Sequence, residues 1–299
     1  MKIGIDIGGS HIGIGLVESN GNIIQKEEMF INDKTNIEEK IEKYITENVI
    51  KMLQKYEVNE IGIAVPGTVT NTKIVKAVNL GIENYDLGTI LQENLSNAGY
   101  AINVKLKNDG KCAALAEQKY GELKGYDNSV FLCIGTGVGS AVIFNGKLLE
   151  PKMVPGFEIS HMIVQKNGAV CNCGKRGCFE VYASLKRFKE KLVKEFNLES
   201  IDGECVREFI YKNPNNLTLK YMLNNYIDDL SVGISNIINI FEPDVICIGG
   251  SFAEYEDILC IPLKQRILSG NLLFNKRCDI IIKLAKLKND AGIIGATLI

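Results

Sequence analysis

Apolar and polar residues along the first 30 positions follow the pattern of short β-strands. Two apolar runs, Lys2–Ile7 and Ile12–Val17, are joined by Gly8-Gly9-Ser10-His11. Asn20-Gly21 then predicts a hairpin turn into a third strand at Ile23–Phe30. Apolar residues recur every three or four positions over 37–53, which predicts a helix, and a buried strand is expected at 61–65.

The same opening recurs in the middle of the chain. A predicted strand at Val130–Ile134 runs into the glycine turn 135–139, and a second strand at Ala141–Phe144 ends in Asn145-Gly146. In both copies Asn-Gly follows the glycine turn after about ten residues. Two matching units predict a duplicated α/β domain that holds a ligand between its halves. Either copy alone is equally compatible with a simple hairpin.

The remaining sequence is mixed α/β. Further helices are expected at 110–120, 183–196, 217–241 and 290–298, and further strands at 245–248 and 280–285. No low-complexity linker separates the halves, so a domain boundary has to come from topology.

Composition narrows the class of protein. With 34 Lys+Arg against 36 Asp+Glu, the net charge of -2 argues against a broad basic surface for nucleic acid. The longest uncharged stretches, 129–146 and 230–241, are too short and too interrupted to predict a membrane span. No signal peptide is recognised, and scattered thiols suit a reducing compartment, so a cytoplasmic protein is expected.

Three of the nine cysteines lie within eight residues, as Cys171, Cys173 and Cys178. Closely spaced thiolates suit Zn²⁺, which takes four nitrogen or sulfur ligands in a tetrahedron. The chain has two histidines, and His161 lies ten residues before the cluster, so the predicted site is Cys₃His and structural. A reduced, metal-free cluster is the alternative.

The two glycine turns can aim backbone N–H groups at phosphate oxygens, because glycine has no Cβ. Asp6, just before the first turn, can hold a water of a hydrated Mg²⁺ ion or simply cap the turn. Asp109 opens a predicted helix after Asn108, where a carboxylate can take a hydroxyl proton during phosphoryl transfer. A helix-capping Asn-Asp pair is the alternative.

Polar residues also gather around the predicted metal loop. Glu158 and His161 are three residues apart, so on one helical turn they share a face, and Glu180 follows Cys178 by two. Two carboxylates and an imidazole in one place are suited to binding a polyol.

These motifs together resemble the ROK family of sugar kinases and related repressors. They occur in the family's order: Asp6-Ile-Gly-Gly-Ser10, Asn108-Asp109, Gly135-Thr-Gly137, Glu158-Ile-Ser-His161, and Cys171-x-Cys-Gly-x-x-Gly-Cys178-x-Glu180. The resemblance extends from residue 3 to Ala291-Gly292-Ile-Ile-Gly295-Ala296. The cysteine motif is its most specific part.

The resemblance implies a duplicated actin-like, ribonuclease-H-type fold that closes over sugar and ATP. It implies a small domain of residues 1–107 plus 288–299 and a large domain of 108–287 with the zinc loop. Asp109 would be the general base, and His161 would serve both zinc and sugar. The implied sugar ligands are Asn79, Asn108, Asp109, Glu158, His161 and Glu180. The implied nucleotide ligands are Asp6, Gly8, Gly9, Ser10, His11, Thr136, Gly137, Gly249 and Gly250.

Two positions depart from the family pattern. His11 stands where the first turn usually ends in lysine, so a fixed positive charge near the phosphates is lost and ATP binding should rest more on Mg²⁺. Ser160 replaces the usual glycine between Glu158 and His161, which requires an ordinary backbone conformation there.

The expected function is ATP-dependent phosphorylation of a hexose at its 6-hydroxyl, with glucose as the default substrate and a homodimer as the expected assembly. N-acetylmannosamine, N-acetylglucosamine, fructose and allose are alternatives, because relatives use nearly the same motifs for them. A sugar-responsive repressor would carry an additional N-terminal winged-helix region, which is not expected here. A silent sugar-binding module or an actin-like ATPase without a sugar acceptor is disfavoured by Asp109 and the set of sugar ligands.

Overall fold

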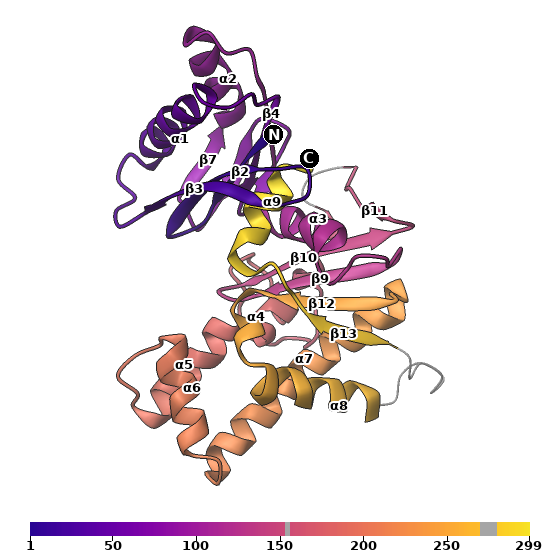
Figure 1. Ribbon diagram of the computed structural model, residues 1–299. Coiled ribbons are helices and arrows are strands. Elements are labelled where there is room, and N and C mark those ends of the chain that lie inside the picture. The colour runs from indigo at the N-terminus through magenta and orange to yellow at the C-terminus, as the bar shows by residue number, and fades with distance from the viewer. Residues whose placement is uncertain (153–155, 270–279) are drawn as a thin grey trace. The chain divides into compact units, whose positions relative to one another are not determined.

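The computed structural model describes residues 1–152, 156–269 and 280–299, and the chain divides into two compact units (Figure 1). Unit 1 comprises Met1–Gly125, Glu150–Gly156 and Leu287–Ile299. Unit 2 comprises Tyr126–Leu149 and Phe157–Lys286. Each unit is built on a five-stranded sheet with helices, so the predicted mixed α/β class is confirmed.

The sheet of unit 1 has the strand order β3-β2-β1-β4-β8. Its strands are β1 (Lys2–Ile7), β2 (His11–Val17), β3 (Ile23–Phe30), β4 (Glu60–Val65) and β8 (Asn103–Asn108). The first three strands pair antiparallel as a meander, whereas β1, β4 and β8 run parallel. The strands predicted over the first 65 residues are therefore confirmed.

The alternation of residues in β1 explains how helices cover this sheet. Ile3, Ile5 and Ile7 are fully buried in the core formed with α1 (Ile37–Leu53) and α2 (Leu87–Asn97). Alternate residues face the other side of the sheet. There a Cβ at Gly4 would overlap the backbone of α9 (Ala291–Ala296) at Ile293. Small residues in the strands thus let the C-terminal helix approach the sheet closely.

The long connection between β4 and β8 carries a small sheet that the sequence pattern did not predict. Its strands are β5 (Thr68–Val69), β6 (Ile74–Ala77) and β7 (Ile82–Tyr85), all antiparallel. They are two to four residues long, too short for periodicity to identify. Asn79 lies in the turn between β6 and β7.

Helix α3 (Asp109–Tyr120) belongs to unit 1, whereas the sequence placed the domain boundary before it, at residue 107. The physical reason is its packing on α9: a Cβ at Gly295 would overlap the Cys112 carbonyl. Glu117 of α3 is fully buried and accepts hydrogen bonds from the N–H groups of Glu122, at 2.8 Å, and Leu287, at 2.7 Å. Its carboxylate therefore joins the segment just before the chain first leaves unit 1 to the start of the C-terminal segment of that unit.

Unit 2 repeats the arrangement of unit 1 with the strand order β11-β10-β9-β12-β13. Its strands are β9 (Ser129–Ile134), β10 (Val138–Phe144), β11 (Lys147–Leu148), β12 (Val245–Gly249) and β13 (Ile281–Leu284). Strands β9, β10 and β11 again pair antiparallel. Strand β12 pairs in parallel with β9, and β13 pairs in parallel with β12. The two sheets thus share one topology, as the repeated strand–glycine turn–strand pattern predicted.

Helices surround the core of unit 2. They are α4 (Phe179–Ala183), α5 (Leu185–Phe196), α6 (Gly203–Lys212), α7 (Leu217–Phe241) and α8 (Ile261–Ser269), with short helical turns η1 (Ile159–His161), η2 (Gly250–Glu254) and η3 (Glu256–Cys260). The predicted helix 183–196 is interrupted at Ser184, and the C-terminal helix is shorter than predicted, after the turn η5 (Lys288–Asp290). Among the residues described, none of the helices could cross a membrane.

Candidate active site

The predicted site residues Asp6 and Asn108 of unit 1 lie at one edge of its sheet. Strands β1, β4 and β8 are parallel, so their carboxyl ends meet at the same edge. Asp6 pairs with Ala64 near the end of β1, and Asn108 is the last residue of β8. Asn108 ties this edge together, because its Nδ2 donates to the Gly67 carbonyl at 3.1 Å while its Oδ1 accepts from Lys111 N–H.

Asp109 is the first residue of α3, and Asn108 is the helix N-cap. The Asp109 Oδ1 accepts a hydrogen bond from the Gly110 N–H at 2.8 Å. Burial raises the pKa of the Asp109 carboxyl, while the Gly110 N–H and the Asn108 side chain lower it. The capping role expected as the alternative therefore falls to Asn108, and Asp109 keeps a half-buried carboxylate with an elevated pKa.

A second carboxylate shares the environment of Asp109. Burial, together with the negative charge of Asp109, raises the pKa of Asp6 to about 7, although the positive charge of Lys26 opposes the shift. A Cβ at Gly292 would overlap the Asp6 carboxylate, so α9 has glycine where it passes this side chain. Two neighbouring carboxylates whose charges repel are typical of a site that binds a cation or accepts a proton.

The first glycine turn is closed by its own backbone. Gly8 N–H donates to the His11 carbonyl at 2.8 Å, and the N–H of Ile31, just after β3, donates to the Ser10 carbonyl at 2.8 Å. Asn79 lies beside this turn, since a Cβ at Gly9 would be 3.7 Å from the Asn79 Cβ. The structure thus brings a predicted sugar ligand next to predicted nucleotide ligands within unit 1.

The second glycine turn lies at the corresponding edge of unit 2. It follows β9, whose parallel neighbour β12 ends at Gly249, opposite Cys133. A Cβ at Gly250 would be 2.6 Å from the Ile134 carbonyl oxygen, and Gly250 has a φ of +74°, which favours glycine. The second glycine turn after β9 and the Gly249-Gly250 pair at the end of β12 therefore begin at the same edge of this sheet.

Two side chains from the following helices hold this second turn, and only one of them was predicted as a site residue. The Glu180 Oε2 accepts from the Val138 N–H at 3.2 Å, and a Cβ at Gly137 would lie 2.7 Å from that oxygen, so an alanine there would displace the carboxylate from this bond. The Ser184 hydroxyl lies 2.8 Å from the Thr136 carbonyl oxygen. Nothing in the local sequence pattern marks Ser184, since it is a single serine 48 residues from its partner.

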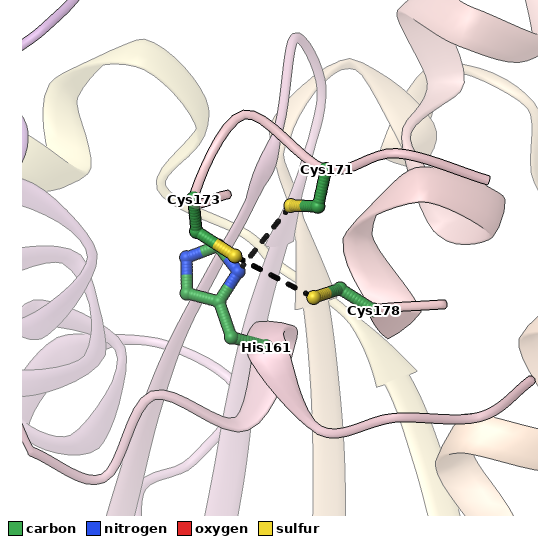
Figure 2. Close-up of side chains that lie close together, drawn as sticks. All are labelled: His161, Cys171, Cys173 and Cys178. Carbon is green, nitrogen blue, oxygen red and sulfur yellow. Dashed lines mark hydrogen bonds between the residues drawn. The ribbon is translucent and has the colours of Figure 1, made fainter. Parts of the chain in front are cut away.

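His161, Cys171, Cys173 and Cys178 form one cluster, with their donor atoms all within 4.8 Å of one another (Figure 2). Cys171 Sγ lies 3.7 Å from His161 Nδ1, and Cys173 Sγ lies 3.6 Å from Cys178 Sγ. Tetrahedral zinc with Zn–S distances of about 2.3 Å places its sulfur ligands roughly 3.8 Å apart. The donor types and spacings of this cluster therefore fit a closed zinc site.

Local backbone geometry explains how one short loop presents three thiols. Gly174 and Gly177 have φ values of +88° and +79°, and a Cβ at Gly177 would overlap the Gln165 carbonyl. The Cys171 N–H donates to the Lys175 carbonyl at 2.8 Å, which closes the loop between the first two cysteines and the third. The tight turn thus requires glycine at both positions.

Glu158 and His161 lie on the same short turn, η1, whose N-cap is Glu158. The His161 N–H donates to the Glu158 carbonyl at 3.0 Å, and the Glu158 side chain is exposed. Ser160 is buried within this right-handed turn, so serine in place of glycine meets no backbone strain. The predicted shared turn of Glu158 and His161 is confirmed.

Comparison with known proteins agrees with this architecture. The chain is 27% identical over 321 residues to a glucokinase from Thermotoga maritima, covering 99% of this chain and 96% of that protein. It is 30% identical over 275 residues to the xylose repressor of Bacillus subtilis, covering 90% of this chain and 68% of the repressor.

Solved structures share the fold. A ROK family glucokinase from Streptomyces griseus, in complex with glucose and AMPPNP, superimposes with a TM-score of 0.80 at 23% identity, covering 99% of this chain and 97% of that one. The fold is therefore the actin-like one of the ROK sugar kinases. The family model for ROK matches residues 2–299. From first strand to last helix, this chain belongs to the ROK family.

Proposed function

We propose that this protein is a sugar kinase that transfers the γ-phosphoryl group of ATP to the 6-hydroxyl of a hexose, with glucose as the default acceptor. Family membership and the similarity to a glucokinase along the whole chain support the kinase activity. The observation that carries the finer proposal is the Asp109 carboxylate, half-buried at the start of α3 with its pKa raised by burial.

Asp109 would act as the general base. A base is most effective when its pKa approaches the working pH, and the elevated pKa of Asp109 moves this carboxyl in that direction. It would accept the proton of the sugar hydroxyl as that oxygen attacks the γ-phosphorus. Phosphoryl transfer otherwise needs placement and charge stabilisation more than covalent chemistry.

The sugar hydroxyls would donate hydrogen bonds to carboxylate oxygens and would exchange further hydrogen bonds with amide and imidazole groups. We assign this role to Asn79, Asn108, Asp109, Glu158, His161 and Glu180. The Nδ1 of His161 faces the thiol of Cys171, which supports a role for its other nitrogen toward a sugar hydroxyl. The Asn108 Oδ1 already accepts the capping bond of α3. Its Nδ2 donates one hydrogen to the Gly67 carbonyl, and its second hydrogen would bind the sugar.

ATP would bind with Mg²⁺ at the glycine turns. Backbone N–H groups of Gly8, Gly9 and Ser10 in the first turn, and of Thr136 and Gly137 in the second, are proposed to bind phosphate oxygens. His11 adjoins the first turn, and the Asp6 carboxylate would hold a water of the magnesium ion. Gly249 and Gly250 would lie against the adenosine, because glycine permits close approach of a flat ring.

The Cys₃His cluster would hold one structural zinc ion. The observation that supports this is the donor set itself, which supplies four nitrogen or sulfur atoms at tetrahedral spacing. With four protein ligands the ion would have no open position for substrate, so its role would be to fix η1 and the loop before α4. A homodimer is the proposed assembly, because two-fold symmetric dimers are the commonest soluble homo-oligomers.

A second candidate is a sugar-responsive binding protein without catalysis, which the 30% identity to a xylose repressor supports. Within the kinases, N-acetylmannosamine, N-acetylglucosamine and fructose are the alternative acceptors. The test is ADP release from Mg-ATP, measured with each hexose in turn and without any sugar. A sugar kinase gives ADP only with its acceptor, whereas ADP release that ignores sugar, or none with any sugar, would refute the proposal.

A further inference from the structure

Ser184 makes an unusual set of contacts for a helix-capping residue. It is 1% exposed, and its Oγ accepts from the Arg187 N–H at 3.4 Å, the normal bond of an N-cap for α5. Its hydroxyl proton points elsewhere, toward the Thr136 carbonyl at 2.8 Å, with the Gly135 carbonyl at 3.3 Å as a weaker acceptor. One hydroxyl therefore joins the start of α5 to the second glycine turn.

The same helix end makes a further bond to this turn. The Lys186 N–H donates to the Gly135 carbonyl at 3.1 Å. Two consecutive carbonyls of the turn, those of Gly135 and Thr136, are thus both directed toward the first residues of α5. The turn is also closed across itself, since the Gly135 N–H donates to the Gly137 carbonyl at 3.0 Å.

Because the peptide group is planar, the direction of these two carbonyls also fixes the direction of the N–H groups in the same peptide units. In a trans peptide the N–H points away from the C=O of the same unit. When the carbonyls of Gly135 and Thr136 point to α5, the N–H groups of Thr136 and Gly137 must point away from it. Within the part of the chain that the structure describes, neither of these two N–H groups has a hydrogen-bond acceptor in the protein.

We infer that Ser184 is a positioning residue for nucleotide binding, which orients the Thr136 and Gly137 N–H groups toward the phosphates of ATP. The inference rests on the proposed kinase function and adds a residue to its nucleotide site. Ser184 does not touch the nucleotide; it acts through the peptide planes of the turn. Without its hydroxyl, the Thr136 carbonyl loses its partner and the peptide between Thr136 and Gly137 is free to rotate.

The experiment compares two variants of unit 2, each of which lacks the N-cap side chain of one helix. Ser184→Ala removes the cap of α5 together with the bond to the turn. Asn216→Ala is the matched control, because Asn216 caps α7 with an Oδ1 that accepts from Leu219 N–H at 3.0 Å. Calorimetry of AMPPNP binding, the KM values for ATP and for sugar, and the melting temperature are measured for both variants.

We expect Ser184→Ala to weaken AMPPNP binding and raise the KM for ATP by about tenfold, the scale of one lost hydrogen bond. The KM for sugar should stay within about twofold, since the sugar ligands are other residues. Asn216→Ala should lower the melting temperature without changing AMPPNP affinity. Wild-type AMPPNP affinity in Ser184→Ala, or an equal loss in both variants, would overturn the inference.

Ser184→Cys covers the case in which alanine prevents folding. A thiol has nearly the shape of the hydroxyl but donates weakly, so an intermediate loss of AMPPNP affinity is expected. A cysteine variant that binds AMPPNP as the wild type does would contradict the inference. Failure of the inference about Ser184 can be told apart from failure of the proposed function. If the kinase proposal itself is wrong, the wild-type protein turns over ATP at a rate that does not depend on sugar.

Discussion

The two glycine turns occupy the same place in two sheets of the same topology, yet different forces hold them. The first, residues 8–11, is closed by backbone bonds to itself and to the end of the neighbouring strand. The second, residues 135–137, depends on Glu180 and Ser184, more than 40 positions along the chain. Two sheets of one topology therefore hold their glycine turns by different contacts, and the side chains that hold the second turn come from a distant part of the chain.

That segment begins at the Cys₃His cluster. Cys178 is the N-cap of α4, and Glu180 and Ser184 lie at the two ends of this five-residue helix. Whatever fixes Cys178 therefore fixes the residues that hold the second turn. The first turn has no such dependence, so the two turns should respond differently to the same perturbation.

Metal removal should give the largest difference. We expect elemental analysis to find about one zinc ion per chain. Loss of the ion in Cys178→Ser should lower the unfolding free energy by several kcal/mol. The reason is that zinc binds only the folded loop, with a free energy of order 10 kcal/mol. Hydrogen exchange should accelerate at 135–137 and 161–184 but not at 8–11. Cys205→Ser, in α6, is the control and should keep its metal; equal zinc content in Cys178→Ser would refute the cluster.

Removing the proposed base should affect chemistry alone. Asp109→Ala should lower kcat by about 10²–10⁴-fold, the usual contribution of a general base, with sugar and AMPPNP affinities nearly unchanged. Binding calorimetry and steady-state kinetics measure the two effects separately. Normal turnover in this variant would exclude Asp109 as the base.

The carboxylates of unit 1 should make its stability depend on pH. The pKa of Asp6 rises from its ordinary 3.8 to about 7 on folding, so the folded protein binds more protons than the unfolded chain between these values. The unfolding free energy should therefore fall as pH rises from about 4 to 7, by up to about 4 kcal/mol in the absence of Mg²⁺. Asp6→Asn should flatten this slope in denaturant titrations; an unchanged slope would contradict it.

A matched pair of glycine substitutions, one in each turn, should change the unfolding free energy least. The difference between the two variants compares the two turns directly. A Cβ at Gly137 would lie 2.7 Å from the Glu180 Oε2, whereas a Cβ at Gly9 meets Asn79 at an ordinary 3.7 Å. Gly137→Ala should cost about 1 kcal/mol of unfolding free energy, the scale of the lost hydrogen bond from Val138 N–H to Glu180, and Gly9→Ala less than about 0.5 kcal/mol. Equal costs by chemical denaturation would mean that the two turns are held alike.

The same contrast explains what the sequence could predict. The first turn and its strands follow from local alternation and an Asn-Gly pair, and the cysteine cluster lies within eight residues, so both were predicted. Ser184 was missed because its partner is 48 residues away, and the helix expected over 183–196 is in fact broken there to form the cap.

The unpredicted strands β5 to β7 have a similar cause. They are stabilised by pairing with one another and by packing into the core of unit 1, neither of which local periodicity reports. The boundary placed before α3 missed the packing of α3 on α9, a contact between residues near 110 and residues near 295. In each case the deciding contact is distant in sequence.

The most direct test of the proposed function identifies the product by ³¹P NMR after incubation with Mg-ATP and glucose. A sugar kinase of this design gives ADP and a phosphate monoester on C6 of the sugar, and neither forms when the sugar is omitted. Inorganic phosphate released at the same rate with and without hexose would contradict it.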